Sequence, residues 1–418
     1  MKKILISAYG CEPSKGSEQG VGWHWAREIA KTYEVWVITR TNNREAIEAE
    51  LGRTDAARIR FVYFDLHPAV LRRKRGPRGL YWYYFAWQWG AYRRAKRLIR
   101  EVEFDYCMHL TFGSVWLPTF MYRLPVPFIW GPLGGGESVP PRLFSLLPVK
   151  EAAVQAARLL LIALVRFNPL FVGPARSATA IIARTEETRD AFPRRYRHKV
   201  WVALETAMPG DLLNYPVNER GGGQTRFVCT GRLVPTKNVA LAVRAFAEAA
   251  SRSRMSLTVV GDGPLRSELE ALTKQLGAQD LVQFVGARSW KETISILRGA
   301  DVFLFPSLKE GGTWSLMEAM ALGLPSICIN VSGMRVITDP STAFRLAPSH
   351  PSELHHSMVR AIRDLAENAD LRKSMGAAAR ARIERLFVWS QKGVFFRELV
   401  EELEKENARE CQQHGRSK

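Results

Sequence analysis

The chain has 418 residues, of which 46% are hydrophobic, and a formal net charge of +19. This composition excludes a disordered chain, and the length allows two domains with separate cores. Five scattered cysteines without metal-ligand spacing argue against a disulfide framework and suit a reducing cytoplasm, while no apolar run approaches the ~20 residues of a membrane span.

Short apolar runs in the first half predict a series of buried strands separated by helices. A glycine-rich loop at 16–23 leads into a helix that ends near Lys31. Pro216 and the glycines at 221–223 indicate a linker. The predicted strands are Ile4–Ala8, Val35–Thr39, Ile59–Phe64, Tyr106–Leu110, Phe128–Trp130, Ala180–Ala183 and Val200–Leu204.

The second half starts the same alternation again. Helices are expected at Lys237–Ser251, from Gly263 to about Leu276, at Trp290–Arg298 and around Glu318. The predicted strands are Arg226–Thr230, Leu257–Val260, Val282–Val285, Asp301–Phe305 and Pro325–Asn330.

Repeated strand–helix units imply parallel sheets with right-handed crossovers, so the predicted fold class is α/β with two Rossmann-like, doubly wound domains facing each other across a cleft. The predicted boundaries are 1–205 for an N-terminal domain, 206–224 for a linker and 225–388 for a C-terminal domain. A helix at 389–418 is expected to continue on the second domain or to cross back to the first. A ligand belongs at the carboxyl ends of the strands.

Residues 66–100 contain no acidic residue and combine basic clusters with a Trp/Tyr-rich stretch. Such a segment suits an anionic bilayer surface, because cations attract headgroups and aromatic rings favour the interface. Two alternatives stay open: a core helix with solvated arginines, and a single-stranded nucleic-acid surface. The basic residues are Arg72, Arg73, Lys74, Arg75, Arg78, Arg93, Arg94, Lys96, Arg97 and Arg100. Residues 142–171 offer a second candidate surface.

Seven residues separate Glu310 from Glu318, in a segment that reads as strand, glycine-rich turn and helix. Such a turn presents free backbone N–H groups at the positive end of a helix dipole, which is an anion site that commonly holds phosphate. In the alternative interpretation, Ser315 and Glu318 form a capping box and Glu310 is a solvated loop residue.

Several motifs occur together in the order found in one enzyme family. The motifs are Gly231-Arg232-Leu233 with Lys237, Gly261-Asp262-Gly263-Pro264, Phe284-Val285-Gly286, Asp301 to Ser307, and Glu310-x7-Glu318. In this, the chain resembles the family-4 retaining glycosyltransferases of GT-B fold (glycosyl transferases group 1). The first half, with Gly16-Ser17-Glu18 and Trp130 to Glu137, looks like a bacterial branch of that family.

The resemblance implies roles for residues of the second domain. Arg232 and Lys237 match the basic pair that holds the donor diphosphate. Glu310 matches the acid near the reacting sugar carbon, and Glu318 the acid that binds the nucleotide ribose. The turn at Gly312 and the amides of Thr313, Trp314 and Ser315 match the cradle for the distal phosphate, although Thr313 stands where most members have glycine.

In the first domain, Gly20 matches a glycine in the loop that approaches donor and acceptor. A tight helix–strand contact would explain that glycine equally well. His109 matches a histidine that contacts the donor sugar, or it serves as a hydrogen-bonded structural residue. Val285 and Arg288 lie where relatives hold the base.

The resemblance implies a metal-independent hexosyltransferase with an N-terminal acceptor-binding domain and a C-terminal nucleotide-sugar-binding domain. The scattered cysteines and the basic, aromatic surface of the first domain favour a cytoplasmic protein, peripheral at the inner face of the cytoplasmic membrane. The expected partners are a UDP- or GDP-linked donor, a lipid-linked or saccharide acceptor and an anionic membrane surface, with no nucleic acid and no other cofactor. The expected process is envelope or exopolysaccharide assembly. The chain holds no Asp-x-Asp motif, so no metal is predicted. The alternatives are a non-catalytic binding protein of the same fold, a nucleotide-sugar epimerase and a charge-driven nucleic-acid binder.

Overall fold

The chain forms two compact units in a computed structural model that describes residues 1–13, 15–52, 58–71, 76–216, 223–250 and 254–415. Unit 1 comprises Met1–Gly136, Leu161–Thr206 and Trp389–Lys418, and unit 2 comprises Glu137–Leu160 and Ala207–Val388. The predictions for residues 72–75 and for the glycines at 221 and 222 fall outside the described residues, as does the side chain of Arg78.

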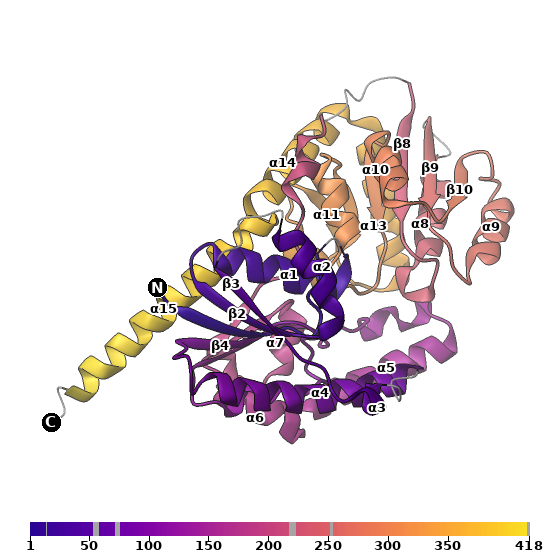
Figure 1. The fold of residues 1–418 in the computed structure, drawn as a ribbon. Coiled ribbons are helices and arrows are strands. Elements are labelled where there is room, and N and C mark those ends of the chain that lie inside the picture. The colour runs from indigo at the N-terminus through magenta and orange to yellow at the C-terminus, as the bar shows by residue number, and fades with distance from the viewer. Residues whose placement is uncertain (14, 53–57, 72–75, 217–222, 251–253, 416–418) are drawn as a thin grey trace. The chain divides into compact units, whose positions relative to one another are not determined.

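Unit 1 is built on a seven-stranded parallel sheet with the order β3-β2-β1-β4-β5-β6-β7 (Figure 1). Every predicted strand of the first half is present, within a few residues at each end. The strands are β1 (Lys3–Ser7), β2 (Glu34–Thr39), β3 (Ile59–Tyr63), β4 (Tyr106–His109), β5 (Phe128–Leu133), β6 (Ala180–Ala183) and β7 (Val200–Val202).

Helices cover this sheet, and the last helix of the chain also belongs to unit 1. The apolar core of unit 1 includes Trp87, Trp130 and Phe171, all fully buried. The helices are α1 (Ser17–Ala30), α2 (Arg44–Leu51), α3 (Pro68–Leu71), α4 (Gly76–Leu98), α6 (Pro169–Ser177), α7 (Glu186–Ala191) and α15 (Trp389–Gly415).

Unit 2 has a six-stranded parallel sheet with the order β10-β9-β8-β11-β12-β13. The strands are β8 (Thr225–Thr230), β9 (Met255–Val260), β10 (Val282–Gly286), β11 (Val302–Phe305), β12 (Ser326–Ile329) and β13 (Ala343–Leu346). The helices are α8 (Val239–Ala250), α9 (Arg266–Gln275), α10 (Trp290–Arg298), α11 (Trp314–Ala321), α12 (Ser332–Ile337), α13 (Pro351–Glu367) and α14 (Ala369–Leu386). The division between the units falls inside α5 (Val149–Leu164).

Each sheet has one place where the strand order reverses direction. In unit 1 this place lies between β1 and β4, and in unit 2 between β8 and β11. The connections on either side of such a point leave in opposite directions, so the strand ends there are left open to a ligand. The loops after β8 and β11 carry Arg232, Lys237 and Glu310. Both predicted parallel sheets are therefore present, and their topology selects the edge where a site belongs.

Two glycine turns bring the ends of β8 and β9 into contact. Gly231 and Gly261 have φ values of +148° and +137°. A Cβ atom on Gly261 would lie 1.9 Å from the Gly231 carbonyl oxygen. Only glycine fits there, because any side chain would combine backbone strain with a direct clash. The turns therefore fix where the chain leaves both strands.

Three features bear on the predicted organisation: the first is one of the two alternatives left open, the second differs from the predicted domain boundaries, and the third was not predicted. The helix that begins at Trp389 clusters with unit 1, where Lys392 donates to the Leu204 carbonyl oxygen over 2.7 Å. Residues 137–160 cluster with unit 2, where Gln155 accepts from Lys309 over 2.8 Å. Strand β13 has only four residues and two half-buried positions, too little apolar pattern for a prediction.

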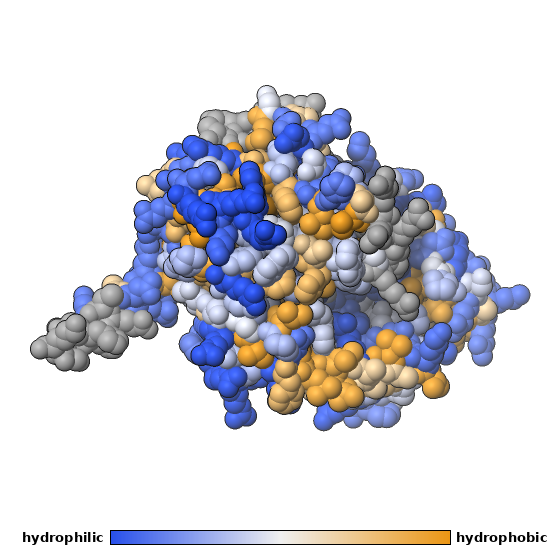
Figure 2. All heavy atoms as spheres, turned by 60° about the horizontal axis from the view of Figure 1, so that its bottom comes forward, coloured by the Kyte–Doolittle hydropathy of each residue, from blue (hydrophilic) through white to orange (hydrophobic). Residues whose placement is uncertain are grey.

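The aromatic stretch of 66–100 forms α4, whose two faces differ. Tyr83, Tyr84 and Trp87 are fully buried. On the other face Trp82 and Trp89 are 53% and 41% exposed. Figure 2 turns the bottom of Figure 1, with α4 and α6, toward the viewer and shows patches of apolar side chains on that face. The core-helix alternative therefore holds for one face of α4, and a role of the exposed aromatic side chains at a membrane surface stays a prediction.

The second candidate surface also carries exposed apolar side chains. Leu161, Leu164 and Phe167 are between 48% and 72% exposed. Within the described residues no single helix has the length and apolarity of a membrane span; only the bent pair Val149–Phe167 and Pro169–Ser177 meets both criteria together.

We predict that Gly261→Ala lowers the free energy of unfolding by about 2 to 5 kcal/mol, the sum of left-handed strain and overpacking. Gly277→Ala is the matched control, because Gly277 has a φ of +65° but no atom within 4 Å of a built Cβ. The control should cost only about 1 to 2 kcal/mol. Urea denaturation of both variants measures the difference, and equal losses would contradict the proposed clash.

Candidate active site

Two basic residues follow β8 in unit 2. Gly231 turns the chain, Arg232 comes next, and Lys237 ends the short 3₁₀ helix η7 (Pro235–Lys237). The aliphatic part of Lys237 lies over Gly231, about 3.7 Å from where a Cβ would stand. Arg232 is exposed and has no carboxylate partner among the residues that the structure describes. The strand end therefore presents one guanidinium and one ammonium group.

Lys237 and Glu310 form an ion pair that joins the ends of the neighbouring strands β8 and β11. Both side chains are about one-fifth exposed, and the Lys237 ammonium group also lies 5.5 Å from the centre of the Phe305 ring. The amide of Leu308 donates to the Thr236 carbonyl oxygen over 2.9 Å and ties the two loops together. Residues that lie far apart in sequence are thus held at one point.

The turn after Glu310 leads into α11 and gives the helix its N-cap at Thr313. The Met317 amide donates to the Thr313 carbonyl oxygen over 3.1 Å. Trp314 and Ser315 lie in the first turn of α11. The first N–H groups of an α-helix have no acceptors within the helix. The hydroxyl of Thr313 is buried and has no hydrogen-bond partner in the described part of the chain. An anion bound at this helix start would meet backbone donors and the positive end of the dipole.

The backbone beside Gly312 is held in place by α12. The Gly333 amide donates to the Glu310 carbonyl oxygen over 3.0 Å, and a Cβ on Gly333 would stand 2.0 Å from the Gly311 carbonyl oxygen. The shape of the turn therefore depends on a glycine outside it, which sequence spacing alone does not reveal.

Glu318 does not form a capping box. Its carboxylate accepts a hydrogen bond from the indole N–H of Trp290 over 2.8 Å, and the helix has no side-chain cap. Glu318 is 8% exposed. Burial raises the pKa of Glu318, and the bond from Trp290 partly offsets that rise. This carboxylate is thus held in place by α10 rather than by its own helix, which excludes the capping alternative.

In unit 1, Gly20 is buried in the first turns of α1. A Cβ on Gly20 would stand 2.1 Å from the Lys15 carbonyl oxygen. The glycine is thus required by the chain's own backbone, and its contact with a ligand stays a prediction.

His109 ends β4 and is 1% exposed. Its Nε2 lies 3.3 Å from the Tyr84 hydroxyl, and its Nδ1 has no hydrogen-bond partner among the described residues. Burial lowers the pKa of His109 to about 3, so the ring is neutral at neutral pH. The predicted contact with a donor sugar is not tested by this geometry.

Two side chains of interest had no assigned role in the sequence analysis. Glu18 accepts from the Phe112 amide over 2.9 Å, and burial raises the pKa of Glu18. Phe112 has a φ of +54°, which is strained for an aromatic residue. Trp290 was placed on a predicted helix but not connected with Glu318. The sequence signal for Glu18 was its place in Gly16-Ser17-Glu18, and that for Trp290 was a tryptophan at the start of a predicted helix.

The base-contact positions lie at and after β10. Val285 is half-buried within the strand, and Arg288 is exposed and lies 3.9 Å from Glu292, one helical turn away. No nearby group distinguishes these two side chains as base ligands.

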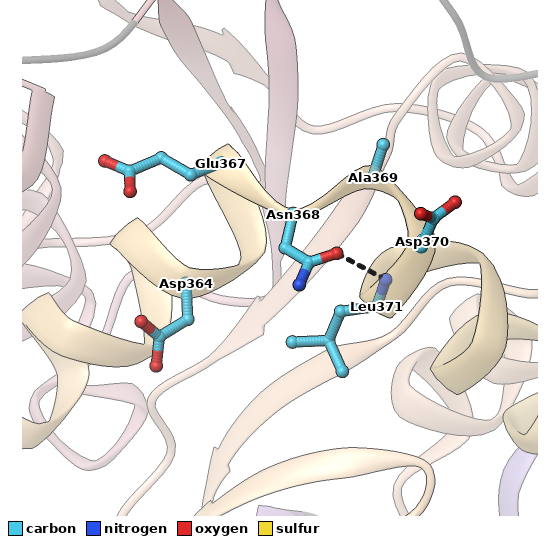
Figure 3. A pocket seen from close by; sticks show the side chains of 6 residues that line it. All are labelled: Asp364, Glu367, Asn368, Ala369, Asp370 and Leu371. Atoms are coloured by element: carbon cyan, nitrogen blue, oxygen red, sulfur yellow. Dashed lines mark hydrogen bonds between the residues drawn. The ribbon is translucent and has the colours of Figure 1, made fainter.

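A separate pocket of about 660 Å³ opens where α13 meets α14 (Figure 3). Asn368 caps α14 by accepting from the Leu371 amide over 2.8 Å, and Asp364 and Asp370 also line the pocket. None of the predicted site residues lines it. In the described part of the chain, no three His, Cys, Asp or Glu side chains are grouped closely enough to hold a metal ion.

The geometry of unit 2 agrees with a known family. A family model described as "Glycosyl transferases group 1" matches residues 215–382, a range that contains Arg232, Lys237, Glu310 and Glu318. Residues 215–382 are thus similar to this family, and they make up less than half of the chain.

Curated relatives match part of the chain. A 2-deoxystreptamine glucosyltransferase of Streptomyces kanamyceticus is 33% identical over 150 residues, which are 35% of this chain and 38% of the relative. A GDP-mannose-dependent monoacylated alpha-(1-6)-phosphatidylinositol monomannoside mannosyltransferase of Corynebacterium glutamicum is 28% identical over 173 residues, 40% of this chain and 44% of the relative. The match thus spans less than half the length of either relative.

Solved structures match almost the whole fold. Sucrose-phosphate synthase from Thermosynechococcus elongatus has a TM-score of 0.58 at 17% identity, over 96% of this chain and 99% of that one. HepE from Anabaena, solved in complex with UDP, has a TM-score of 0.56 at 15% identity, over 96% and 100%. These similarities confirm the predicted GT-B fold class.

We predict that Glu318→Gln stabilises the protein at neutral pH. The raised pKa means that the folded state holds the Glu318 proton more tightly than the unfolded state, so this group's contribution to stability falls as pH rises through that pKa. Glutamine removes the buried charge and still accepts from Trp290. Urea denaturation at pH 4 and pH 8 should show a gain that is larger at pH 8. A gain that is the same at both pH values would contradict the burial argument.

Proposed function

We propose that the chain is a retaining glycosyltransferase that moves a sugar from a nucleotide-sugar donor to a hydroxyl acceptor. One observation carries the proposal: the Lys237–Glu310 ion pair joins the ends of β8 and β11 at the strand-order reversal of unit 2. Arg232 follows the same β8 end, and the loop after β11 leads into the helix that carries Glu318. The matched family supports transfer of a glycosyl group, and the retaining outcome comes from the resemblance.

The cations and the helix start would stabilise the departing nucleoside diphosphate. As the sugar–phosphate bond breaks, negative charge builds on the diphosphate, and preorganised donors lower that barrier without reorganising. Arg232 offers a bidentate fork and Lys237 a point charge. Because Lys237 pairs with Glu310, an arriving diphosphate would share the ammonium group with that carboxylate.

The two carboxylates would have different tasks. Glu310 would lie near the sugar and favour the positive charge that develops at its reacting carbon. Glu318 would accept hydrogen bonds from the ribose hydroxyls, with the Trp290 indole keeping the carboxylate in one orientation. Metal-independent catalysis is part of the proposal: Arg232 and Lys237 would have the role that a metal ion has in other glycosyltransferases.

The donor is proposed to be UDP- or GDP-linked. The Anabaena structure holds UDP, and the Corynebacterium relative is named for GDP-mannose, so the comparisons support either base. The acceptor is proposed to be lipid-linked or a saccharide, in bacterial envelope or exopolysaccharide assembly. Exposed aromatic side chains on α4 support a position at the cytoplasmic face of an anionic membrane.

We predict that Arg232→Ala and Lys237→Ala each weaken binding of UDP or GDP by about tenfold or more, because each removes a charge-assisted hydrogen bond. Arg244→Ala is the control, since Arg244 is exposed on α8 in the same unit. Isothermal titration calorimetry on all three variants measures the effect. Unchanged affinity in both site variants would place the diphosphate elsewhere.

We predict slow hydrolysis of one donor in a panel of UDP-glucose, UDP-N-acetylglucosamine and GDP-mannose without added acceptor. Glu310→Gln should lower that rate by about 100-fold while leaving nucleotide affinity within about threefold. Chromatography separates the outcomes. Free sugar and nucleoside diphosphate support the transferase, a new nucleotide sugar supports the epimerase, and tight binding without turnover supports the non-catalytic protein.

A further inference from the structure

A cavity of about 550 Å³ lies in unit 1 beside α4, apart from every residue proposed for sugar transfer. Its floor comes from the segment that follows β3, with Phe64 and Leu66. Its wall is one stripe of α4. Trp89 and Gly90 line one end of the stripe, and three arginines line the other end.

The cavity is shaped by a glycine on α4. A Cβ on Gly90 would stand 2.4 Å from the Phe64 ring, so only glycine allows the ring to lie this close to the helix. The Trp87 indole N–H donates to the Phe64 carbonyl oxygen over 2.9 Å and fixes the backbone of the floor. Side chains three and four residues apart share one face of a helix. The stripe is therefore ordered, with its apolar end first and its basic end last.

The basic end has no internal counter-charge. Arg93, Arg94 and Arg97 are exposed, and none of them pairs with a carboxylate in the described part of the chain. The chain has no acidic residue between 66 and 100. Asp65, next to the cavity floor, is already held by Arg40 over 3.0 Å and by the Tyr83 hydroxyl over 2.6 Å. Like charges one helical turn apart repel each other, so an external anion would be stabilising here.

We propose that this cavity binds a phosphate ester that carries an apolar chain, as in the headgroup region of a lipid. Guanidinium groups bind phosphate oxygens in a bidentate way, so Arg93 and Arg97 would hold the phosphate. The chain would run along Trp89 toward the exposed face of α4, where Phe85 and Trp82 are 44% and 53% exposed. This proposal adds a ligand class to the proposed function. It rests on that function only for where the lipid would come from.

The test is calorimetric titration of the full chain with dodecyl phosphate below its micellar concentration. R93Q/R97Q removes two cations that line the cavity. K96Q/R100Q is the matched control, because it removes two exposed cations from the same segment that do not line the cavity. We expect the first variant to lose at least about tenfold in affinity and the control less than about twofold. Equal losses would overturn the proposal in favour of general electrostatic attraction.

Two further ligands test the two halves of the proposal. Inorganic phosphate should bind at least about tenfold more weakly than dodecyl phosphate, because it lacks the apolar part. Dodecyl maltoside should not depend on Arg93 or Arg97. If inorganic phosphate binds as tightly, or if the neutral detergent loses affinity in R93Q/R97Q as well, the site does not recognise a phosphate-bearing chain.

A second variant keeps the test valid if the double arginine variant folds poorly. Ala86 lines the apolar end, so Ala86→Phe should weaken dodecyl phosphate and leave inorganic phosphate unchanged. Unchanged dodecyl phosphate affinity would contradict the placement of the chain.

The outcome separates this site from the proposed function. R93Q/R97Q should retain UDP or GDP binding, and R232A should retain dodecyl phosphate binding. Flotation with phosphatidylglycerol vesicles, compared with phosphatidylcholine vesicles, identifies a bilayer lipid as the source. We expect wild type to float with the anionic vesicles and R93Q/R97Q to float less. Binding of dodecyl phosphate by a chain that binds no nucleotide would refute the transferase and keep the cavity assignment.

Discussion

The reversal of strand order between β8 and β11 is the constraint on which the unit 2 site depends. Because the two strands are neighbours and parallel, their carboxyl ends lie at one edge, and the loops that follow must share that edge. Lys237 and Glu310, 73 residues apart, meet there as an ion pair. A backbone hydrogen bond from Leu308 to Thr236 holds the same loops together, so the pair does not depend on two long side chains alone.

This constraint also explains what the sequence could predict. Apolar runs identified both sheets, and the motif order located the basic pair and the two carboxylates. Trp290 was missed because its bond to Glu318 depends on the packing of α10 beside α11, which no local pattern encodes. Strand β13 was missed because its central two positions are half-buried and its four residues give no clear period. Capping was a reasonable local interpretation of Ser315 and Glu318, yet tertiary contact gave the carboxylate another partner.

The glycines show the same limit of prediction from sequence. Gly20 was interpreted as a position of close ligand approach or of a tight helix–strand contact, whereas the group against it is the Lys15 carbonyl oxygen in the loop before α1. Gly261 and Gly231 were recognised from motifs, but their mutual contact explains why both positions need glycine. Gly333 supports the turn after Glu310, which is proposed to bind phosphate, without belonging to any predicted motif. A glycine therefore marks a close approach, while the structure is needed to identify the group that approaches.

The charge of the chain points beyond the donor site. Residues 66–100 hold ten basic and no acidic residues, and so supply ten of the nineteen net positive charges. Arg232 and Lys237, the pair proposed to hold the diphosphate, lie outside this segment. Tyr84 and Trp87 are fully buried on the inner face of α4, which fixes the rotation of the helix about its axis. Core packing thereby determines where Arg93, Arg94 and Arg97 stand. Rotating α4 about its axis would bring Tyr84 and Trp87 out of the core. The three arginines are therefore held in their positions beside the cavity.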